Sequence, residues 1–480
     1  MEKRIPRLLL AAGASGSGKT LLTCGLLQVL VNRKIKTVSF KCGPDYIDPM
    51  FHTQVIGTKS RNLDTFFTGE EVTRNLLAKN SADCEIAVME GVMGFYDGVA
   101  GITTQASAYD LARVTDTPVI LIVNSKGMSV SLAAYIKGFL EYRQDSHIKG
   151  VIFNQMSPML YPRMKKLVEE ELGIKALGYV PKVEDCVIES RHLGLVLPEE
   201  IPELQQRLLK LAKVLENSLD IEGIIKLAEE APKLFYEPLK EEWVRTSFFL
   251  PGTEKGSQKL RIGLARDEAF CFFYEDNLDL LRTMGAELVP FSPVHDSHLP
   301  EDLDGLLLYG GYPELNAKAL EENKSMREEI SAAIKGGMPC LAECGGFMYL
   351  HDQIEGMDGK LYEMTGVIPG KVWRTSKLTR FGYITLEQKK ETVLGEMDLG
   401  ISPAHEFHYF DSENCGTAFH ASKPHSKRGW DCIHGSDSLL AGFPHLYYYA
   451  NPKIPQAFLK KCLEYHLSIM LTGAMKEQQT

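Results

Sequence analysis

The sequence has little of three things: long apolar stretches, cysteine, and positive charge in excess. Its longest purely apolar runs, such as Leu8–Ala12 and Val119–Val123, are far shorter than the ~20 residues that cross a bilayer. We therefore expect no membrane-spanning helix. The chain has 53 Lys and Arg against 63 Asp and Glu, a formal net charge of −10. Because proteins bind phosphate backbones mainly through clustered Lys and Arg, this charge disfavours a general nucleic-acid-binding role.

The ten cysteines are irregularly spaced and form no Cys-x-x-Cys pair. Only Cys340 and Cys344 are close together, so neither a cysteine zinc site nor a disulfide framework is expected. Residues 1–6 carry charges and lead toward a glycine-rich turn rather than into the apolar core of a signal peptide. These features predict a cytoplasmic protein in which most cysteines are small buried side chains.

A length of 480 residues predicts two or three domains, and 44% hydrophobic with 24% charged residues is typical of a globular protein. In the first half, short apolar runs alternate with helix-length amphipathic segments, which predicts a parallel sheet with crossover helices. The first helix is expected over Thr20–Asn32. The expected strands are Leu8–Ala12, Thr37–Lys41, Glu85–Glu90, Pro118–Asn124 and Gly150–Asn154.

The chain becomes irregular and rich in Pro, Gly and Ser between residues 238 and 258, which indicates a linker. Short apolar runs then resume at Leu260–Ala265, Gly305–Tyr309 and Met338–Ala342, each followed by a turn and a helical stretch. We therefore predict an α/β protein of two domains. The first covers residues 1–237 and the second covers residues 259–480.

The segment Gly13-Ala-Ser-Gly-Ser-Gly18-Lys19-Thr20 fits the P-loop pattern G-x-x-x-x-G-K-T and lies between a predicted strand and a predicted helix. Glycines let backbone N–H groups converge on phosphates, the lysine neutralises phosphate oxygens, and the threonine hydroxyl reaches Mg²⁺. The alternative is a turn that merely reverses the chain. The predicted nucleotide-binding residues are Gly13, Ser15, Gly16, Ser17, Gly18, Lys19 and Thr20.

Two acidic clusters follow the ends of predicted strands, where open parallel sheets bind their ligands. Asp45 and Glu90 are the predicted Mg²⁺ ligands together with Thr20, because Mg²⁺ prefers hard oxygen donors. Helix capping or a solvated turn is the alternative for both. For Asp48 and Asp97 a turn role is equally compatible, because each precedes Pro or Gly.

In the second half, Cys344 directly follows a predicted strand and precedes two glycines and a helical stretch. This is the pattern of a nucleophile elbow, in which a tight turn exposes the sulfur and stabilises its thiolate. The loop Tyr309-Gly310-Gly311 ends the preceding strand and could supply backbone N–H donors to an oxyanion. The alternative for Cys344 is a buried small residue.

A nucleophilic cysteine needs a base, and thirteen histidines are available. His445 is the leading candidate because it lies beside a late predicted strand of the same domain. His405 and His408 are the other candidates. Cysteine and histidine that are distant in sequence but close in the fold suit acyl transfer through a thioester.

Taken together, these stretches resemble the cobyrinic acid a,c-diamide synthase family over nearly the whole chain. That family joins a dethiobiotin-synthetase-like ATPase domain to a class I glutamine amidotransferase domain. The resemblance rests on the P-loop, Lys41-Cys-Gly-Pro-Asp-Tyr-Ile-Asp-Pro, Glu90-Gly-Val-Met-Gly-Phe-Tyr-Asp-Gly, Arg191-His-Leu-Gly-Leu, Ala342-Glu-Cys-Gly-Gly-Phe-Met-Tyr-Leu and His405-Glu-Phe-His-Tyr.

The resemblance implies that Cys344 is the glutaminase nucleophile and that His445 activates it. Class I triads commonly place a Glu two residues after the His, but here that position is Tyr447, which indicates a Cys-His dyad. The implied reaction is ATP- and glutamine-dependent amidation of the a and c carboxylates of cobyrinic acid, through an acyl phosphate and a Cys thioester, with Mg²⁺. The implied partners are cobyrinic acid or a related tetrapyrrole, L-glutamine and ATP, and a homodimer is left open.

Three other functions stay open at this stage. The same chemistry could act on nickel sirohydrochlorin or on other corrin carboxylates. The chain could also be a P-loop switch ATPase with an inactive amidotransferase module, although a complete elbow at Cys344 argues against this. A dethiobiotin-type carboxylase would not need residues 260–480.

A polycarboxylate substrate needs local positive charge on an acidic protein. The segment Lys371-Val-Trp-Arg374-Thr-Ser-Lys377-Leu-Thr-Arg380 places a cation at every third position and adds the flat face of Trp373. It is a candidate macrocycle contact, and a solvated charged strand edge is the alternative.

Overall fold

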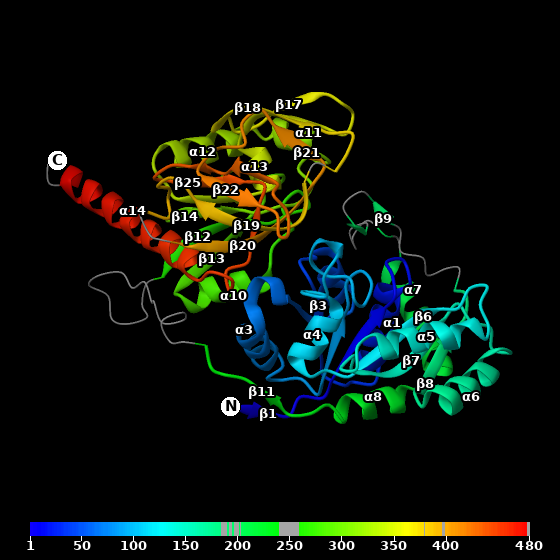
Figure 1. Cartoon of the computed structure of the whole chain (residues 1–480). Helices are drawn as coiled ribbons and strands as arrows, with labels where there is room; N and C mark the ends of the chain where they lie inside the picture. The colour runs from blue at the N-terminus through cyan, green and yellow to red at the C-terminus, as the bar shows by residue number, and fades with distance from the viewer. Residues whose placement is uncertain are drawn as a thin grey trace. The chain divides into compact units, whose positions relative to one another are not determined.

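The computed structural model describes residues 1–183, 190–191, 194–195, 201, 203–239, 259–378, 380–395 and 399–477. The chain forms two compact units, Met1–Pro238 and Leu239–Thr480, drawn from blue to green and from green to red in Figure 1. Most of the predicted linker, residues 240–258, lies outside the described part of the chain, as do His192 and Leu193 of the Arg191 stretch.

Unit 1 is built on a parallel sheet whose strands run in the order β4-β3-β5-β2-β6-β7-β8. Their interior residues are nearly all buried, as expected for a parallel sheet that is covered on both faces. The strands are β2 (Arg7–Ala12), β3 (Thr37–Cys42), β4 (Lys59–Leu63), β5 (Ile86–Glu90), β6 (Val119–Asn124), β7 (Ile148–Asn154) and β8 (Lys175–Val180).

The strand order places β3, β5 and β2 next to one another. Their carboxyl ends carry the Asp45 stretch, Glu90 and the P-loop, so three candidate segments meet at one edge of the sheet. Two short pairs, β1 (Glu2–Lys3) with β11 (Leu234–Phe235) and β9 (Ser190–Arg191) with β10 (Gly194–Leu195), lie outside this sheet.

Helices connect and cover these strands (Figure 1). They are α1 (Lys19–Asn32), α2 (Ile47–Met50), η1 (Phe51–Val55), α3 (Thr65–Asn80), η2 (Val99–Gly101), α4 (Ala108–Thr115), α5 (Ser131–Tyr142), α6 (Tyr161–Leu172), α7 (Leu204–Ser218) and α8 (Ile221–Glu229). The apolar side of α7 packs on α1, where Leu211 and Leu215 approach Gly25 so closely that a larger residue there would clash.

Unit 2 has a second sheet in the order β13-β12-β14-β15-β25-β24, parallel except for the β24–β25 pair. Its strands are β12 (Leu260–Ala265), β13 (Ala286–Phe291), β14 (Gly305–Leu308), β15 (Cys340–Glu343), β24 (His434–Gly435) and β25 (Leu439–Gly442). Its helices are α10 (Glu275–Thr283), α11 (Ala317–Glu322), α12 (Lys324–Lys335), α13 (Gly345–Tyr349) and α14 (Lys453–Glu477).

Two further sheets of unit 2 were not anticipated from the sequence. One is antiparallel, with β23 (Gly429–Cys432), β22 (Phe419–Ser422), β19 (Arg380–Gln388), β20 (Ile401–His408) and β26 (His445–Leu446). The other is mixed, with β17 (Leu361–Glu363), β16 (His351–Glu355), β18 (Ile368–Arg374) and β21 (Phe410–Ser412). The first matters for function because β26 carries His445 and β20 carries His405.

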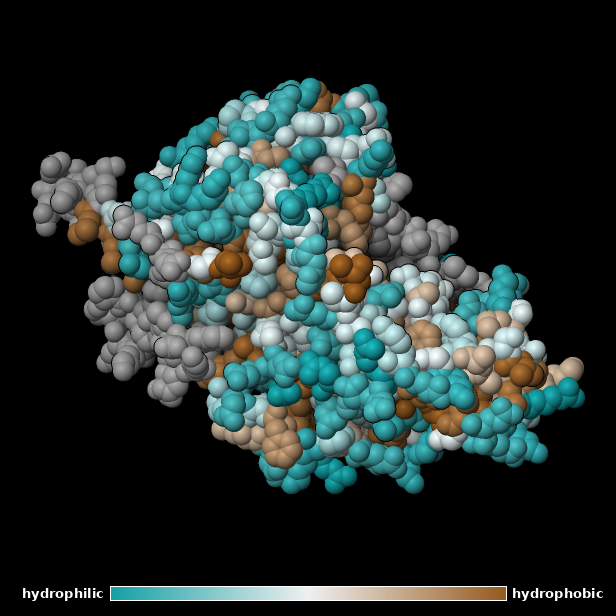
Figure 2. Space-filling model, in the orientation of Figure 1, coloured by the Kyte–Doolittle hydropathy of each residue, from teal (hydrophilic) through white to brown (hydrophobic). Residues whose placement is uncertain are grey.

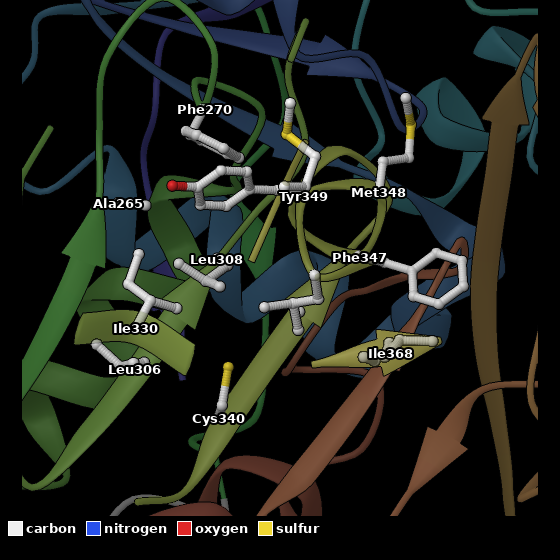
Figure 3. Close-up of a cluster of buried hydrophobic side chains, with 14 of the residues drawn as sticks. Ala265, Phe270, Leu306, Leu308, Ile330, Cys340, Phe347, Met348, Tyr349 and Ile368 are labelled. Atoms are coloured by element: carbon white, nitrogen blue, oxygen red, sulfur yellow. The ribbon is translucent and has the colours of Figure 1, made fainter. Parts of the chain in front are cut away.

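The core of unit 2 forms around β14 and β15, where side chains from the strands meet those of the short helix α13 (Figure 3). Phe347 and Tyr349 are fully buried there, and burying one such side chain contributes about 2 kcal/mol of transfer free energy. Cys340 belongs to this core, and burial raises the pKa of its thiol far above the ordinary value. It therefore behaves as the small apolar residue expected from the sequence.

The α/β architecture with two domains is confirmed. The predicted strands of both sheets are present, with bounds shifted by two residues or fewer at each end. The sequence patterns missed β4, β8 and β13, and of these β4 has a single apolar residue, Leu63. Hydrophilic residues cover most of each unit on the face shown in Figure 2, and hydrophobic residues occur there in small groups. In the described residues, no helix is long and apolar enough to cross a membrane.

Candidate active sites

The P-loop connects β2 to α1, and its backbone requires glycine at two positions. Gly16 and Gly18 have φ of 74° and 89°, in the left-handed region that other residues rarely adopt. A Cβ on Gly18 would lie 2.5 Å from Nδ2 of Asn154, which itself donates to the Ser17 carbonyl. Ser15 and Gly16 are exposed at the tip of the loop. The loop is thus held by Asn154 on one side and exposed at its tip, as a phosphate-binding loop must be.

Lys19 folds back over this loop. Its ammonium donates to the carbonyl oxygens of Ala14 at 3.1 Å and Met93 at 2.6 Å. Burial and the neighbouring Lys41 ammonium lower the pKa of Lys19 to about 8, against the opposing effect of nearby carboxylates. A phosphate at the loop would supply the negative charge that this lysine lacks.

Glu90, the last residue of β5, is fully buried and lies at the centre of the site. Its Oε1 accepts from the Thr20 hydroxyl at 2.6 Å and from the Lys41 ammonium at 2.8 Å, and its Oε2 lies 3.3 Å from Nε2 of His52. Burial alone would raise the pKa of Glu90, but Lys41 and His52 outweigh it and hold the pKa below its usual value. Glu90 is therefore an anion in contact with the P-loop threonine.

Asp48 is the second carboxylate at this point. Its Oδ2 pairs with the Lys41 ammonium and lies 3.3 Å from the Thr20 hydroxyl, which can donate to it. Burial and the carboxylates of Asp45 and Glu90 raise its pKa. The sequence left the role of Asp48 open, whereas the structure places it, with Glu90 and Thr20, around one point.

One carboxylate oxygen of Asp45 is hydrogen-bonded to the backbone. Its Oδ1 accepts from the backbone N–H groups of Ile47 at 2.8 Å and Asp48 at 3.0 Å, so it stabilises the start of α2. Asp97 accepts from the N–H of Gly94 at 3.0 Å, as a turn residue does. The metal-ligand role of Asp45 stays a prediction, and its observed contacts are those of the capping alternative.

The donor set fits Mg²⁺ by its chemistry. The Thr20 hydroxyl and the carboxylates of Asp48 and Glu90 are hard oxygen donors, and Mg²⁺ usually takes one or two carboxylates together with phosphate oxygens and water. Among the described residues, no group of three His, Cys, Asp or Glu side chains could hold a metal alone.

Lys41 and His52 were missed as site residues. Both are buried, and both contact Glu90. A lysine near the end of a buried strand itself indicates a charged site, because a buried ammonium needs carboxylates around it. His52 carried no such signal, because its position depends on the π-helix η1 that follows α2.

The second site is the turn at Cys344, between β15 and α13. Cys344 has φ 47° and ψ −103°, a strained conformation for a residue with a side chain. The turn is anchored by the Cys344 N–H on the Gly442 carbonyl at 2.8 Å and by the Gly346 N–H on the Tyr309 carbonyl at 3.0 Å. A Cβ on Gly346 would lie 1.9 Å from the Leu308 carbonyl oxygen, so glycine is required there. The predicted elbow turn is present, but the exposure predicted for Cys344 is not observed: the residue is 6% exposed and belongs to the core of unit 2.

The structure brings His445 to Cys344. His445 lies on β26 and is buried, and its side chain is hydrogen-bonded to that of Cys344. Burial would lower the pKa of His445, but Cys344 and Glu343 outweigh it and raise the pKa to about 10. The predicted oxyanion loop is also adjacent, since a Cβ on Gly310 would lie 2.7 Å from Cε1 of His445 and 3.5 Å from Cβ of Cys344.

The two other histidines are placed differently. His405 pairs across the strands with His445, with ring centroids 6.4 Å apart, and burial holds its pKa well below the usual value. His408 donates its Nδ1–H to the Phe410 carbonyl at 2.7 Å and stacks on Phe443, with the ring centroids 3.9 Å apart, as a packed residue does. Neither lies against Cys344 as His445 does.

The basic segment Lys371–Arg380 already has charged and aromatic neighbours. Lys371 pairs with Glu413 at 3.8 Å, and with Trp373 and Glu355 it lines a hollow of about 480 Å³. Because Glu355 and Glu413 both line this hollow beside Lys371, its charge does not favour a polycarboxylate ligand. Macrocycle binding by this segment stays a prediction without support from these charges.

These two sites define a class of protein: a P-loop nucleotide-binding domain joined to a cysteine-histidine glutamine amidotransferase domain. Residues 8–195 match the model of the CobQ/CobB/MinD/ParA nucleotide binding domain, and residues 261–449 match that of the CobB/CobQ-like glutamine amidotransferase domain.

Three proteins named cobyrinate a,c-diamide synthase are similar to this chain over nearly its full length. The one from Caldanaerobacter subterraneus subsp. tengcongensis is 39% identical over 95% of this chain and 98% of its own. Those from Thermoplasma volcanium and Priestia megaterium are 38% and 37% identical, over 96% and 95% of this chain and 98% and 97% of their own. The chain belongs to the cobyrinate a,c-diamide synthase family, and it is a glutamine-dependent, amide-forming ligase with a nucleotide-binding domain.

Proposed function

We propose that this enzyme amidates the a and c carboxylates of cobyrinic acid, using ATP to activate each carboxylate and glutamine to supply ammonia. Residues 1–237 would carry the activating half and residues 259–480 the glutaminase half. The observation that carries the proposal is the presence, in one chain, of a phosphate cradle with clustered carboxylates and of a strained cysteine beside a buried histidine.

A carboxylate is a poor electrophile, so one of its oxygens must first become a leaving group. The substrate carboxylate attacks the γ-phosphorus of ATP, the bond to the β–γ bridging oxygen breaks, and ADP leaves an acyl phosphate. Lys19 neutralises phosphate oxygens, and the P-loop N–H groups from Gly13 to Thr20 hold the nucleotide. When bound, Mg²⁺ supplies charge neutralisation at the phosphates, and Thr20, Asp48 and Glu90 would hold it, with Asp45 positioning Asp48.

Ammonia comes from glutamine. Cys344 attacks the side-chain amide carbon while His445 takes the thiol proton and returns it to the departing nitrogen. The oxyanion is held by backbone N–H groups near Gly310 and Gly311, and water then hydrolyses the thioester to glutamate. Ammonia attacks the acyl phosphate, and inorganic phosphate leaves as the amide forms.

The test is mass spectrometry of candidate macrocycles incubated with the enzyme, ATP, Mg²⁺ and glutamine. Each replaced carboxylate lowers the mass by about 1 Da, and two replacements on cobyrinic acid are expected, with one ADP formed for each. Products from nickel sirohydrochlorin or another corrin, with none from cobyrinic acid, would reassign the substrate. ATP hydrolysis without any amide would favour the switch-ATPase alternative.

We further propose a cytoplasmic location, where glutamine, ATP and reduced cysteine are available, and we leave a homodimer open to measurement by light scattering. None of the nine described cysteines forms a disulfide, which is compatible with a reducing compartment.

A further inference from the structure

Tyr447, two residues after His445, makes its hydrogen bond with a different residue. Tyr447 donates its hydroxyl to Oδ2 of Asp276 on α10, at 3.1 Å, and both groups are buried. The neighbouring Asn277 donates to the Leu446 carbonyl at 2.8 Å. These contacts fix the strand segment that carries His445, and they direct the Tyr447 hydroxyl to α10.

A carboxylate nevertheless reaches the histidine from a different element. Glu343 is the last residue of β15 and the immediate neighbour of Cys344. Its Oε2 lies 3.6 Å from Nδ1 of His445, and the two side chains are 6% and 3% exposed. Its Oε1 has no hydrogen-bond partner within the described residues. His445 and a backbone hydrogen bond at Leu446 stabilise the charged form of this buried carboxylate.

We propose that Glu343 is the positioning residue of the glutaminase site. It would replace the carboxylate that class I triads commonly place two residues after the histidine. The proposal rests on the roles proposed above for Cys344 and His445. Glu343 acts through His445, and no direct role on the glutamine substrate is assigned to it.

The chemistry explains why such a group is needed. In the first step the S–H bond of Cys344 breaks, its proton moves to the ring of His445, and the thiolate electron pair attacks the amide carbon of glutamine. Because Nδ1 faces Glu343, the proton enters on Nε2. The resulting imidazolium is buried, and a buried cation needs a compensating anion. Later the proton leaves Nε2 for the amide nitrogen as the C–N bond breaks and ammonia departs.

The charged groups around the His445 ring agree with a positioning role for Glu343. The groups that face His445 are Cys344 and Glu343 from the β15 turn and His405 from β20. Burial lowers the pKa of His405, so Glu343 is the group among these three that can carry a negative charge opposite the protonated ring in addition to Cys344. With Cys344 it raises the pKa of His445 to about 10. Removing its charge must lower that pKa, and the basic limb of the glutaminase pH profile must move to lower pH.

The experiment compares Glu343→Gln, which keeps the shape, with Glu343→Asp, which keeps the charge, in the full-length enzyme. For Glu343→Gln we expect kcat with glutamine to fall on the order of 10²-fold with little change in the KM for glutamine. The basic limb of kcat/KM should move down by about one pH unit. Glu343→Asp should return the basic limb of kcat/KM to its wild-type pH and recover part of kcat. Tyr447→Phe is the matched control and should keep the wild-type limb.

Two measurements keep the outcome decisive. Amidation with ammonium salt reports whether Glu343→Gln is folded, and the pH dependence of Cys344 alkylation, followed by peptide mass spectrometry, reports the ring charge directly. A Glu343→Gln enzyme with wild-type glutamine turnover, or with lower turnover but an unchanged alkylation profile, overturns the proposal. Glutamine-dependent activity in Cys344→Ala would instead overturn the role of Cys344, whatever Glu343→Gln shows.

Discussion

The Thr20 hydroxyl donates to Oε1 of Glu90 at 2.6 Å and so joins the second residue of α1 to the last residue of β5. This bond links the phosphate cradle to the carboxylates. Thr20 follows β2 and Glu90 ends β5, so their meeting is a consequence of the strand order β5-β2 in the parallel sheet.

Cys344→Ala should abolish glutamine-dependent amidation, by more than about 10³-fold, because no other group can form the thioester. Amidation with added ammonium salt should persist, since the activating half does not use the sulfur. Both rates can be followed by ADP release. Loss of both activities, or of neither, would contradict the assigned role.

Lys19→Ala should stop amidation from either nitrogen source, because the ammonium that neutralises the transferred phosphoryl group is lost. Glutamine hydrolysis should survive in part, as the residues of that site lie in unit 2. Calorimetric titration with ATP and a glutamate assay separate the two effects. A Lys19→Ala enzyme with normal amidation would remove the P-loop from the mechanism.

Asp48→Asn and Glu90→Gln should each raise the Mg²⁺ concentration that supports half-maximal amidation, because each removes an anionic oxygen beside Thr20. Asp45→Asn should raise it less, since Oδ1 of Asp45 is engaged with the backbone of α2. A Mg²⁺ titration at fixed ATP measures all three. An equal effect of Asp45→Asn would identify Asp45 as a ligand, as the sequence predicts.

Gly346→Ala should destabilise unit 2 by about 1–3 kcal/mol, because the added Cβ would lie 1.9 Å from the Leu308 carbonyl oxygen and the turn at Cys344 must shift. Glutaminase activity should fall with it. Gly138→Ala is a suitable control, since open space surrounds that helical position in α5 and alanine favours a helix there. Denaturant unfolding of the two variants tests the difference.

Acid should weaken unit 2 through His351, which is buried between the Phe347 carbonyl and the Ser412 hydroxyl. Burial lowers its pKa from 6.5 to about 4, so the unfolded chain binds a proton between these values that the folded chain excludes. Stability is therefore full above pH 6.5 and declines as pH falls toward 4. From pH 7 to pH 5 the free energy of unfolding should drop by about 2 kcal/mol from this residue.

The matched variant is His351→Gln, which keeps hydrogen-bonding groups but does not titrate. It should be less stable than the wild type at pH 7 yet lose less stability on acidification. Urea unfolding at both pH values gives the comparison. An equal loss in both proteins would show that His351 does not carry the acid sensitivity.

The sequence by itself determined the features that depend on local chemistry. The pattern Gly13–Thr20 needs only its own glycines, lysine and threonine to form a cradle between a strand and a helix. The elbow at Cys344 likewise follows from a strand end and two adjacent glycines. Short, almost wholly apolar runs predicted the parallel strands because both faces of such strands are buried.

Only the tertiary structure decided which distant groups meet. The sequence pattern favoured Asp45 over Asp48 as a ligand, but the turn into α2 directs Asp48 to Thr20 and engages Oδ1 of Asp45 with the backbone. Glu343 carried no signal, because its contact with His445 depends on β15 and on β26, which pairs with an unpredicted antiparallel sheet. Contacts of this kind depend on strand order and side-chain direction across a hundred residues, and no local pattern encodes them.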